Sequence, residues 1–225
     1  MTQTPDAAMP DALRARLAAD YAPVTPLAPP LVRALWVLPF AVLTLLAAST
    51  TFELRMDASR LGWGGTWGVS GAQAMIGLVL VAAALREAVP GRGWKRPAAV
   101  AWLLAPLAVV VGVTLFSWEM SPVQLRTGWM WVGTLCFTGS AVSALPAVAL
   151  SSALAARAYP TRPGFTGALL GLGAGLMADA GWRLFCHFSE PAHVLAAHLG
   201  GVLTAALAGA LLATFLATRP LNFER

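Results

Sequence analysis

The sequence predicts an all-α polytopic membrane protein with six transmembrane helices in an up-down bundle. Hydrophobic residues make up 58% of the 225 residues and charged residues only 11%, whereas soluble proteins carry about 25% charged residues. Six apolar stretches are long enough for a helix to cross a bilayer, which takes about 20 residues. The expected spans are residues 34–52, 67–88, 98–118, 127–153, 164–185 and 193–218.

The lysines and arginines predict the orientation, because positively charged loops resist translocation. With the N-terminus inside, four of the 15 lie outside and the remaining eleven lie inside. The outer four are Arg55, Arg60, Arg126 and Arg183. We therefore expect a cytoplasmic leader at residues 1–33, a membrane domain at residues 34–218 and a cytoplasmic tail at residues 219–225. The dispersed charges suit anionic lipid headgroups and do not predict direct nucleic-acid binding.

The leader divides into a short helix and a spacer. Pro10 suits the first turn of a helix that would end by Asp20, with Leu13 and Leu17 on a weak apolar face. The proline-rich residues 21–30 cannot continue a helix and indicate an extended spacer. Two interpretations stay open: a disordered tail, or a recognition helix that orders on a cytoplasmic partner.

Small residues recur every four positions in the last two expected spans. The fifth span carries Gly167, Gly171 and Gly175, and the sixth carries Gly201, Ala205 and Gly209. Small residues at this spacing lie on one helix face and let another backbone approach closely. We therefore expect the fifth and sixth helices to pack tightly against each other.

Asp179 is the clear intramembrane carboxylate, and it lies four residues after Gly175. Arg183 follows one helical turn later, so the two charges can neutralise each other while the arginine extends toward the membrane surface. We interpret Asp179 and Arg183 as a structural pair. A transport site remains the alternative, because ionisable groups inside a membrane often mark one.

The two cysteines, Cys136 and Cys186, both fall toward the predicted outer side. They are either small buried hydrophobes or a redox-reactive or metal-reactive pair, and a disulfide between them stays open. Cys186, His187 and His193 could supply ligands to a transient metal ion. His193 and His198 are about 140° apart around an α-helix, so we expect that they cannot chelate together from one helix.

The whole layout resembles that of the NrsF-type membrane anti-sigma factors, which are six-helix proteins of the bacterial inner membrane. Four segments carry the resemblance, which covers about residues 13–217. They are the Ala-Pro-Val-Thr-Pro-Leu-Ala-Pro-Pro stretch at 22–30, Cys136 with Pro146 ten residues later, the Pro-Thr-Arg-Pro-Gly stretch at 160–164, and Cys186.

The resemblance implies an anti-sigma factor that holds an extracytoplasmic-function (ECF) sigma factor inactive through its N-terminal segment. The implied contact residues are Leu13, Arg14, Arg16, Leu17 and Asp20. The resemblance also gives Cys136 and Cys186 a role in sensing. Residues 187–190 depart from the family pattern, which has a proline and an acid close behind the second cysteine. The stimulus therefore stays open between metal, oxidant, and the light stress to which CarR-type relatives respond.

From this resemblance we predict a membrane regulator of transcription that releases its sigma factor on stress and is not an enzyme. Its partners would be the sigma factor and membrane lipids, with no small-molecule substrate and no resident cofactor. One alternative is a small transporter or channel that uses Asp179, although few other polar residues accompany it in the spans. Another is an oligomerising accessory subunit, which the glycine faces alone would suit.

Overall fold

The computed structural model describes residues 10–20, 26–124 and 129–218, and every regular element in these ranges is helical. The elements are α1 (Asp11–Asp20), α2 (Pro30–Leu35), α3 (Leu38–Thr51), α4 (Ala58–Trp63), η1 (Gly64–Gly68), α5 (Val69–Glu87), α6 (Arg96–Met120), α7 (Trp129–Ala156), α8 (Pro163–Phe185), α9 (Pro191–His193), η2 (Val194–Leu199) and α10 (Gly200–Thr218). The segments η1 and η2 are π-helical turns within longer helices. The predicted all-α class is confirmed for these residues.

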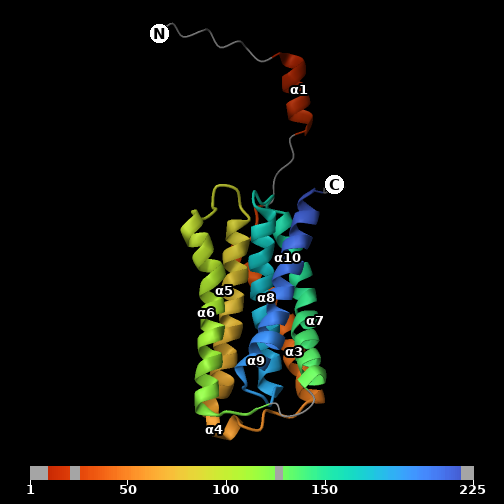
Figure 1. Cartoon of the computed structure of the whole chain (residues 1–225). Helices are drawn as coiled ribbons and strands as arrows, with labels where there is room; N and C mark the ends of the chain where they lie inside the picture. The colour runs from red at the N-terminus through yellow and green to blue at the C-terminus, as the bar shows by residue number, and fades with distance from the viewer. Residues whose placement is uncertain (1–9, 21–25, 125–128, 219–225) are drawn as a thin grey trace.

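Five helical segments of the described chain are long and apolar enough to cross a membrane. They are Pro30–Thr51, Ala58–Glu87, Arg96–Met120, Met130–Ala156 and Pro191–Thr218. The chain is therefore a helical membrane protein. The remaining expected span corresponds to α8, whose glycines and Asp179 lower its mean hydropathy. Because α8 runs alongside the other long helices (Figure 1), six crossings remain our prediction.

Helix α8 lies at the centre of the bundle, where it packs against α3, α5, α7 and α10. Most of its side chains from Thr166 to Phe185 are buried. A helix surrounded by other helices needs no apolar face toward lipid, so it can carry glycines and ionisable groups. The central position of α8 thus explains how a helix of the bundle can hold Asp179 and Arg183 away from lipid.

Backbone contacts at glycines set the distance between α8 and α10. A Cβ atom added at Gly167 would collide with the carbonyl group of Gly209, and one at Gly171 would collide with that of Ala205. At Gly175 the added atom would lie 3.1 Å from Cα of Val202. The fifth and sixth expected spans thus meet through their small residues, because side chains there would force the two backbones apart.

Gly201 differs from Ala205 and Gly209 because it faces α7 and not α8. An added Cβ atom there would lie 2.8 Å from the carbonyl oxygen of Phe137. A further close approach joins α5 to α8, where a Cβ atom at Gly77 or at Gly173 would meet the carbonyl oxygen of the other glycine at 2.5 or 2.6 Å. The sequence pattern does not predict this contact, because Gly77 belongs to no four-residue repeat.

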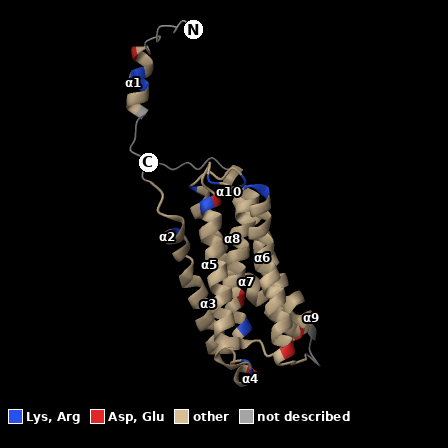
Figure 2. Ribbon diagram, turned by 90° about the vertical axis from the view of Figure 1, so that its left-hand side faces the viewer, with Lys and Arg blue, Asp and Glu red and all other residues tan. Residues whose placement is uncertain are grey.

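The bundle has two chemically different ends. We call the end where α2 begins and α10 stops the leader end, and the opposite end, where α8 stops at Phe185, the cysteine end. Figure 2 shows Lys and Arg residues gathered at the leader end, with a few charged residues at the cysteine end and inside the bundle. This distribution supports a cytoplasmic leader end, since positive charges stay on that side of a membrane.

Candidate functional site

The carboxylate of Asp179 is the centre of a buried polar network. Its side chain is 1% exposed and accepts hydrogen bonds from three groups on other elements. Gln73 Nε2 on α5 and Ser140 Oγ on α7 each lie 2.8 Å from a carboxylate oxygen. His198 Nδ1 on η2 lies 2.7 Å from Oδ1, which assigns the ring proton to Nδ1. These bonds compensate the burial of a carboxylate and join four elements.

Arg183 reaches this network indirectly. Its Nη1 atom donates a hydrogen bond to Gln73 Oε1 over 3.4 Å, and the amide group of Gln73 donates to Asp179. The expected pair is therefore corrected in its geometry: Gln73 connects the two side chains. Three donors from other helices already occupy the oxygens of Asp179, and the longer side chain of Arg183 extends to the amide.

The two cysteines meet at the cysteine end of the bundle. Cys136 lies on α7 and Cys186 follows the last residue of α8, and both side chains are buried. Their sulfur atoms are 3.9 Å apart. Ala197 is buried with them, and Val132, Phe137 and Phe188 pack against the cluster. The packing of α7 against α8 thus juxtaposes two residues that are 50 positions apart in the sequence.

Two histidines complete this cluster. His193 Nε2 lies 3.3 Å from Cys186 Sγ, and the rings of His193 and His198 meet edge to face with centroids 5.5 Å apart. Our expectation that these histidines could not act together was wrong. It assumed an α-helix, whereas residues 194–199 form a π-helical turn. The i→i+5 hydrogen bonding of such a turn returns residue i+5 to the side of residue i.

The set of metal ligands proposed from the sequence is also corrected. Cys186 and His193 belong to the cluster, whereas His187 accepts a hydrogen bond from the backbone N–H of Met56, over 3.1 Å. Cys136 and His198 take the place of His187. The potential ligand atoms of these four buried residues all lie within 4.8 Å of one another. Among the described residues, this is the only group of three or more His, Cys, Asp or Glu side chains whose ligand atoms could hold one metal ion.

At the leader end, buried charged side chains connect the loops and Arg33, the last residue of the leader, to the bundle. The guanidinium group of Arg33 on α2 donates to the carbonyl oxygens of Leu85 (3.0 Å) and Leu154 (3.3 Å). These carbonyls lie near the ends of α5 and α7, where they have few partners within their own helices. The leader is thus joined directly to two helices that also reach the Asp179 network.

A second contact at this end involves Glu87 and Arg162. Their side chains form an ion pair, and the other carboxylate oxygen of Glu87 accepts a hydrogen bond from the backbone N–H of Trp94 over 2.7 Å. Arg162 also donates to the carbonyl oxygen of Trp94. This contact joins the loop between α5 and α6 to the loop between α7 and α8.

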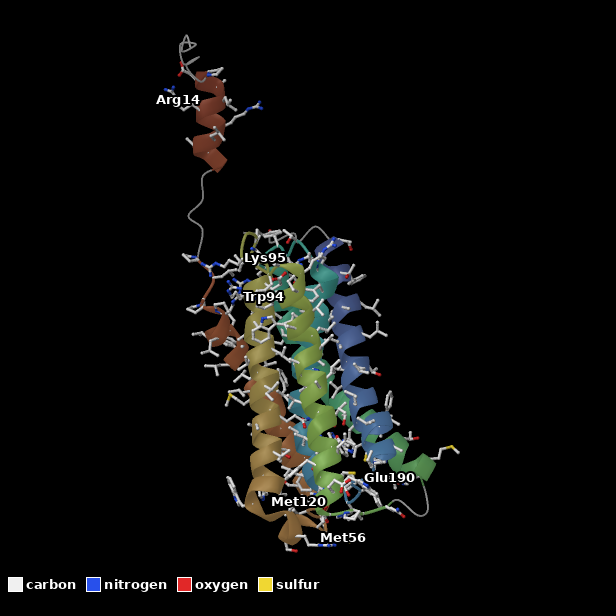
Figure 3. The ribbon with its side chains drawn as sticks, turned by 60° about the vertical axis from the view of Figure 1, so that its left-hand side comes forward. Arg14, Met56, Trp94, Lys95, Met120 and Glu190 are labelled. Atoms are coloured by element: carbon white, nitrogen blue, oxygen red, sulfur yellow. The ribbon has the colours of Figure 1, made fainter. Side chains whose placement is uncertain are left out.

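The residues expected to bind a sigma factor lie on α1. Leu13 and Leu17 are 47% and 54% exposed, and Arg14 lies 3.8 Å from Asp11 in an exposed ion pair. Figure 3 shows Arg14 extending from α1, with Trp94 and Lys95 at the leader end of the bundle. Arg16 is exposed on the same helix, and Asp20 is its last residue. The apolar side chains of α1 are thus free to meet a partner.

These features define a class: a helical membrane protein with a buried thiol and imidazole cluster at one end and a short exposed helix at the other. The family model described as NrsF, negative regulator of sigma F, matches residues 17–218. The chain belongs to this family, as its resemblance indicated, and is a negative regulator of a sigma factor. No curated protein and no solved structure matches it.

Proposed function

We propose that the protein is an inner-membrane anti-sigma factor that binds an ECF sigma factor through its cytoplasmic leader and releases it on a stress signal. The exposure of Leu13 and Leu17 carries this proposal. They are four residues apart and therefore neighbours on one face of α1. Two apolar side chains on one helix face can anchor that helix in a hydrophobic groove of a partner.

Cys136 and Cys186 are the sensing residues in this proposal. They lie at the end of the bundle opposite to the leader, which we assign to the periplasmic side. Cys136 and Ser140 are on α7, one turn apart, and Ser140 bonds to Asp179. A change at the thiols therefore acts directly on a helix that belongs to the polar network.

Helices α5 and α7 also connect the Asp179 network to Arg33 at the end of the leader. Helix α5 supplies Gln73 to the network and the Leu85 carbonyl to Arg33, while α7 supplies Ser140 and the Leu154 carbonyl. A shift of either helix against α8 changes the contacts of Arg33. The signal alters sigma binding only if it favours the shifted position of the helices over the unshifted one, or the reverse.

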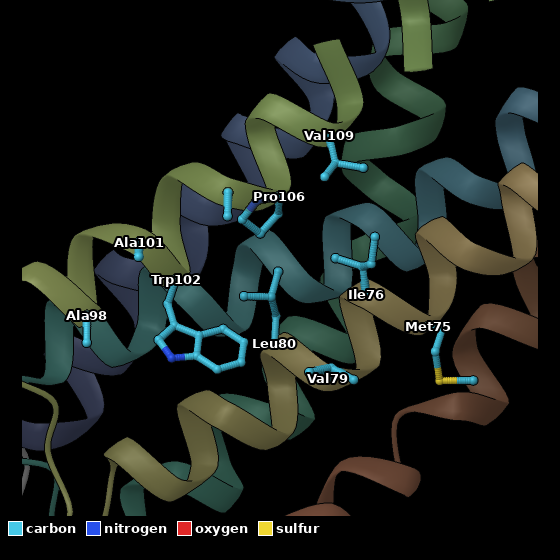
Figure 4. A pocket seen from close by; sticks show the side chains of 10 residues that line it. Met75, Ile76, Val79, Leu80, Ala98, Ala101, Trp102, Pro106 and Val109 are labelled. Carbon is cyan, nitrogen blue, oxygen red and sulfur yellow. The ribbon is translucent and has the colours of Figure 1, made fainter. Parts of the chain in front are cut away.

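Membrane lipids are the second proposed partner. A cavity of about 510 Å³ lies between α5 and α6 and is lined by apolar side chains, including Met75, Trp102 and Val109 (Figure 4). Such a groove matches the chemistry of an acyl chain. Its lining gives no support to the alternative of a channel or transporter, which needs polar groups along a path. Asp179 is also engaged with three donors, which favours a structural role.

Replacing Leu13 and Leu17 together by Ala tests the proposal. The full-length variant should lose sigma binding in a membrane pull-down and should derepress a sigma-dependent reporter, because its apolar face is gone. Leu207 and Leu211 are also exposed and four residues apart, but lie on α10. The matched variant Leu207→Ala/Leu211→Ala should repress normally. Equal repression by both variants would overturn the role of α1.

A further inference from the structure

The cluster at the cysteine end has the composition and spacing of a closed metal site. We infer that Cys136, Cys186, His193 and His198 bind one divalent ion of the Zn²⁺ and Cd²⁺ class in tetrahedral coordination. The binding itself is independent of the leader, while its regulatory consequence rests on the proposed function. Two thiolates and two imidazoles are a ligand set that favours borderline and soft cations over Mg²⁺ and Ca²⁺.

The four ligand atoms lie within 4.8 Å of one another, and the distances from Cys186 agree with a tetrahedral ion. Zinc–sulfur bonds of about 2.3 Å and zinc–nitrogen bonds of about 2.0–2.1 Å separate two sulfur ligands by about 3.8 Å and a sulfur from a nitrogen by about 3.6 Å. The sulfur atoms of Cys136 and Cys186 are 3.9 Å apart, and Cys186 Sγ lies 3.3 Å from His193 Nε2. Disulfide sulfur atoms lie only about 2.05 Å apart. The thiols are thus spaced as two ligands of one ion.

His198 supplies an independent observation that points to a ligand. Its Nδ1 atom bonds to Asp179, whereas its Nε2 atom is buried and has no hydrogen-bond partner among the described residues. Burying an imidazole nitrogen without a partner costs free energy. A metal ion gives this nitrogen its partner. A metal-bound histidine normally donates its other N–H to a carboxylate, a backbone carbonyl or water, and the bond to Asp179 has the first of these forms.

The charges of the cluster also fit a single ion. The incoming ion carries two positive charges, and the two thiols each release a proton to become thiolates. The charge of the site is therefore unchanged on binding, which matters because an uncompensated charge in this buried place is costly.

Ion binding would join three parts of the bundle. Cys136 belongs to α7, Cys186 follows α8, His193 directly precedes the π-helical turn and His198 lies within it. Since His198 also bonds to Asp179, the occupied site holds α7 and the π-helical turn against the polar network. The metal-bound and metal-free sites thus favour different positions of the helices connected to Arg33. Ion binding then changes the affinity for the sigma factor, and sigma binding changes the affinity for the ion by the same factor.

Cobalt titration of the purified, reduced, full-length protein in lipid nanodiscs tests the site. We expect one equivalent of Co²⁺ to give thiolate-to-cobalt charge-transfer absorption and the intense visible bands of tetrahedral coordination, which Zn²⁺ then removes. Cys136→Ser, Cys186→Ser and His198→Gln should abolish these bands. His187→Gln is the matched control and should keep them. Asp179→Asn should weaken binding by about 10–100-fold, as expected for the group that orients a ligand.

Circular dichroism of each metal-free variant separates a lost ligand from a lost fold. Absence of stoichiometric binding by the wild type, weak octahedral bands, or equal loss in His187→Gln would overturn the site. A protein lacking residues 1–20 should bind cobalt like the wild type. Normal cobalt binding without sigma binding by the full chain would refute the proposed function alone, and the reverse result would refute the metal site alone.

Discussion

His198 and Asp179 form a buried imidazole–carboxylate pair, with Nδ1 and Oδ1 2.7 Å apart and both side chains 1% exposed. The pair connects the two polar assemblies of the membrane domain. On one side of it lies the thiol and imidazole cluster, and on the other lie Gln73 and Ser140. The carboxylate thus fixes both the tautomer of His198 and the positions of α5 and α7 around α8.

Replacing Asp179 by Asn should destabilise the bundle. The amide keeps the shape but offers only one acceptor oxygen where three donors converge, and its NH2 group faces donors. Each buried donor left without a partner costs about 1–3 kcal/mol. The midpoint of thermal unfolding in detergent should fall accordingly. The control Glu119→Gln removes an exposed carboxylate and should leave the midpoint unchanged; equal midpoints for both variants would show that the network contributes no stability.

The sequence indicated Asp179 but not its surroundings. An ionisable residue in an apolar span is conspicuous in itself, whereas Gln73 and Ser140 lie 106 and 39 positions away in the sequence and share no period with it. The position of His198 depends on a π-helical turn. The turn results from a local change in the backbone hydrogen bonding, which no pattern of side chains in the sequence predicts. In contrast, the glycine stripe was predictable because its four-residue spacing follows directly from helix geometry.

Gly171→Ala should weaken the packing of α8 against α10. Its Cβ atom would overlap the carbonyl group of Ala205, and backbone cannot rotate away as a side chain can. Overpacking of this kind typically costs about 1–3 kcal/mol, which should lower the thermal midpoint. The matched control is Gly112→Ala on α6, where an added Cβ atom meets nothing within 4 Å. A Gly171→Ala protein as stable as this control would mean that α8 and α10 do not pack at this distance.

Reporter fusions should establish the orientation and test whether α8 crosses the membrane. Fusions at Gly93 and Thr161, both at the leader end, should give cytoplasmic signals because positive charges gather there. Fusions at Asp57 and Ser189 should give periplasmic signals. Thr161 and Ser189 flank α8, so signals from the same compartment at these two positions would exclude its crossing, and inverted signals throughout would place the leader outside.

Changing Cys136 and Cys186 together to Ser should separate repression from its release. The leader is unaltered in this variant, so it should still bind the sigma factor and repress the reporter at rest. Its response to thiol-reactive metal or oxidant should be lost, because the serine hydroxyl group can form neither a thiolate nor a disulfide. A coupling of about 1–3 kcal/mol corresponds to a change of about 5–150-fold in sigma affinity. This is the shift that the wild type should show on stimulation and the double variant should lack.

The single variants and a leader variant complete this test. Cys136→Ser and Cys186→Ser should each respond like the double variant if the two thiols act as one unit, because their sulfur atoms are 3.9 Å apart. Leu13→Ala/Leu17→Ala should show the opposite behaviour, with no repression and therefore nothing to release. A normal stress response in the double cysteine variant would remove the thiols from the mechanism and leave the role of α1 intact. Loss of resting repression in the double variant, with the protein folded and inserted, would instead place the cysteines in sigma binding itself.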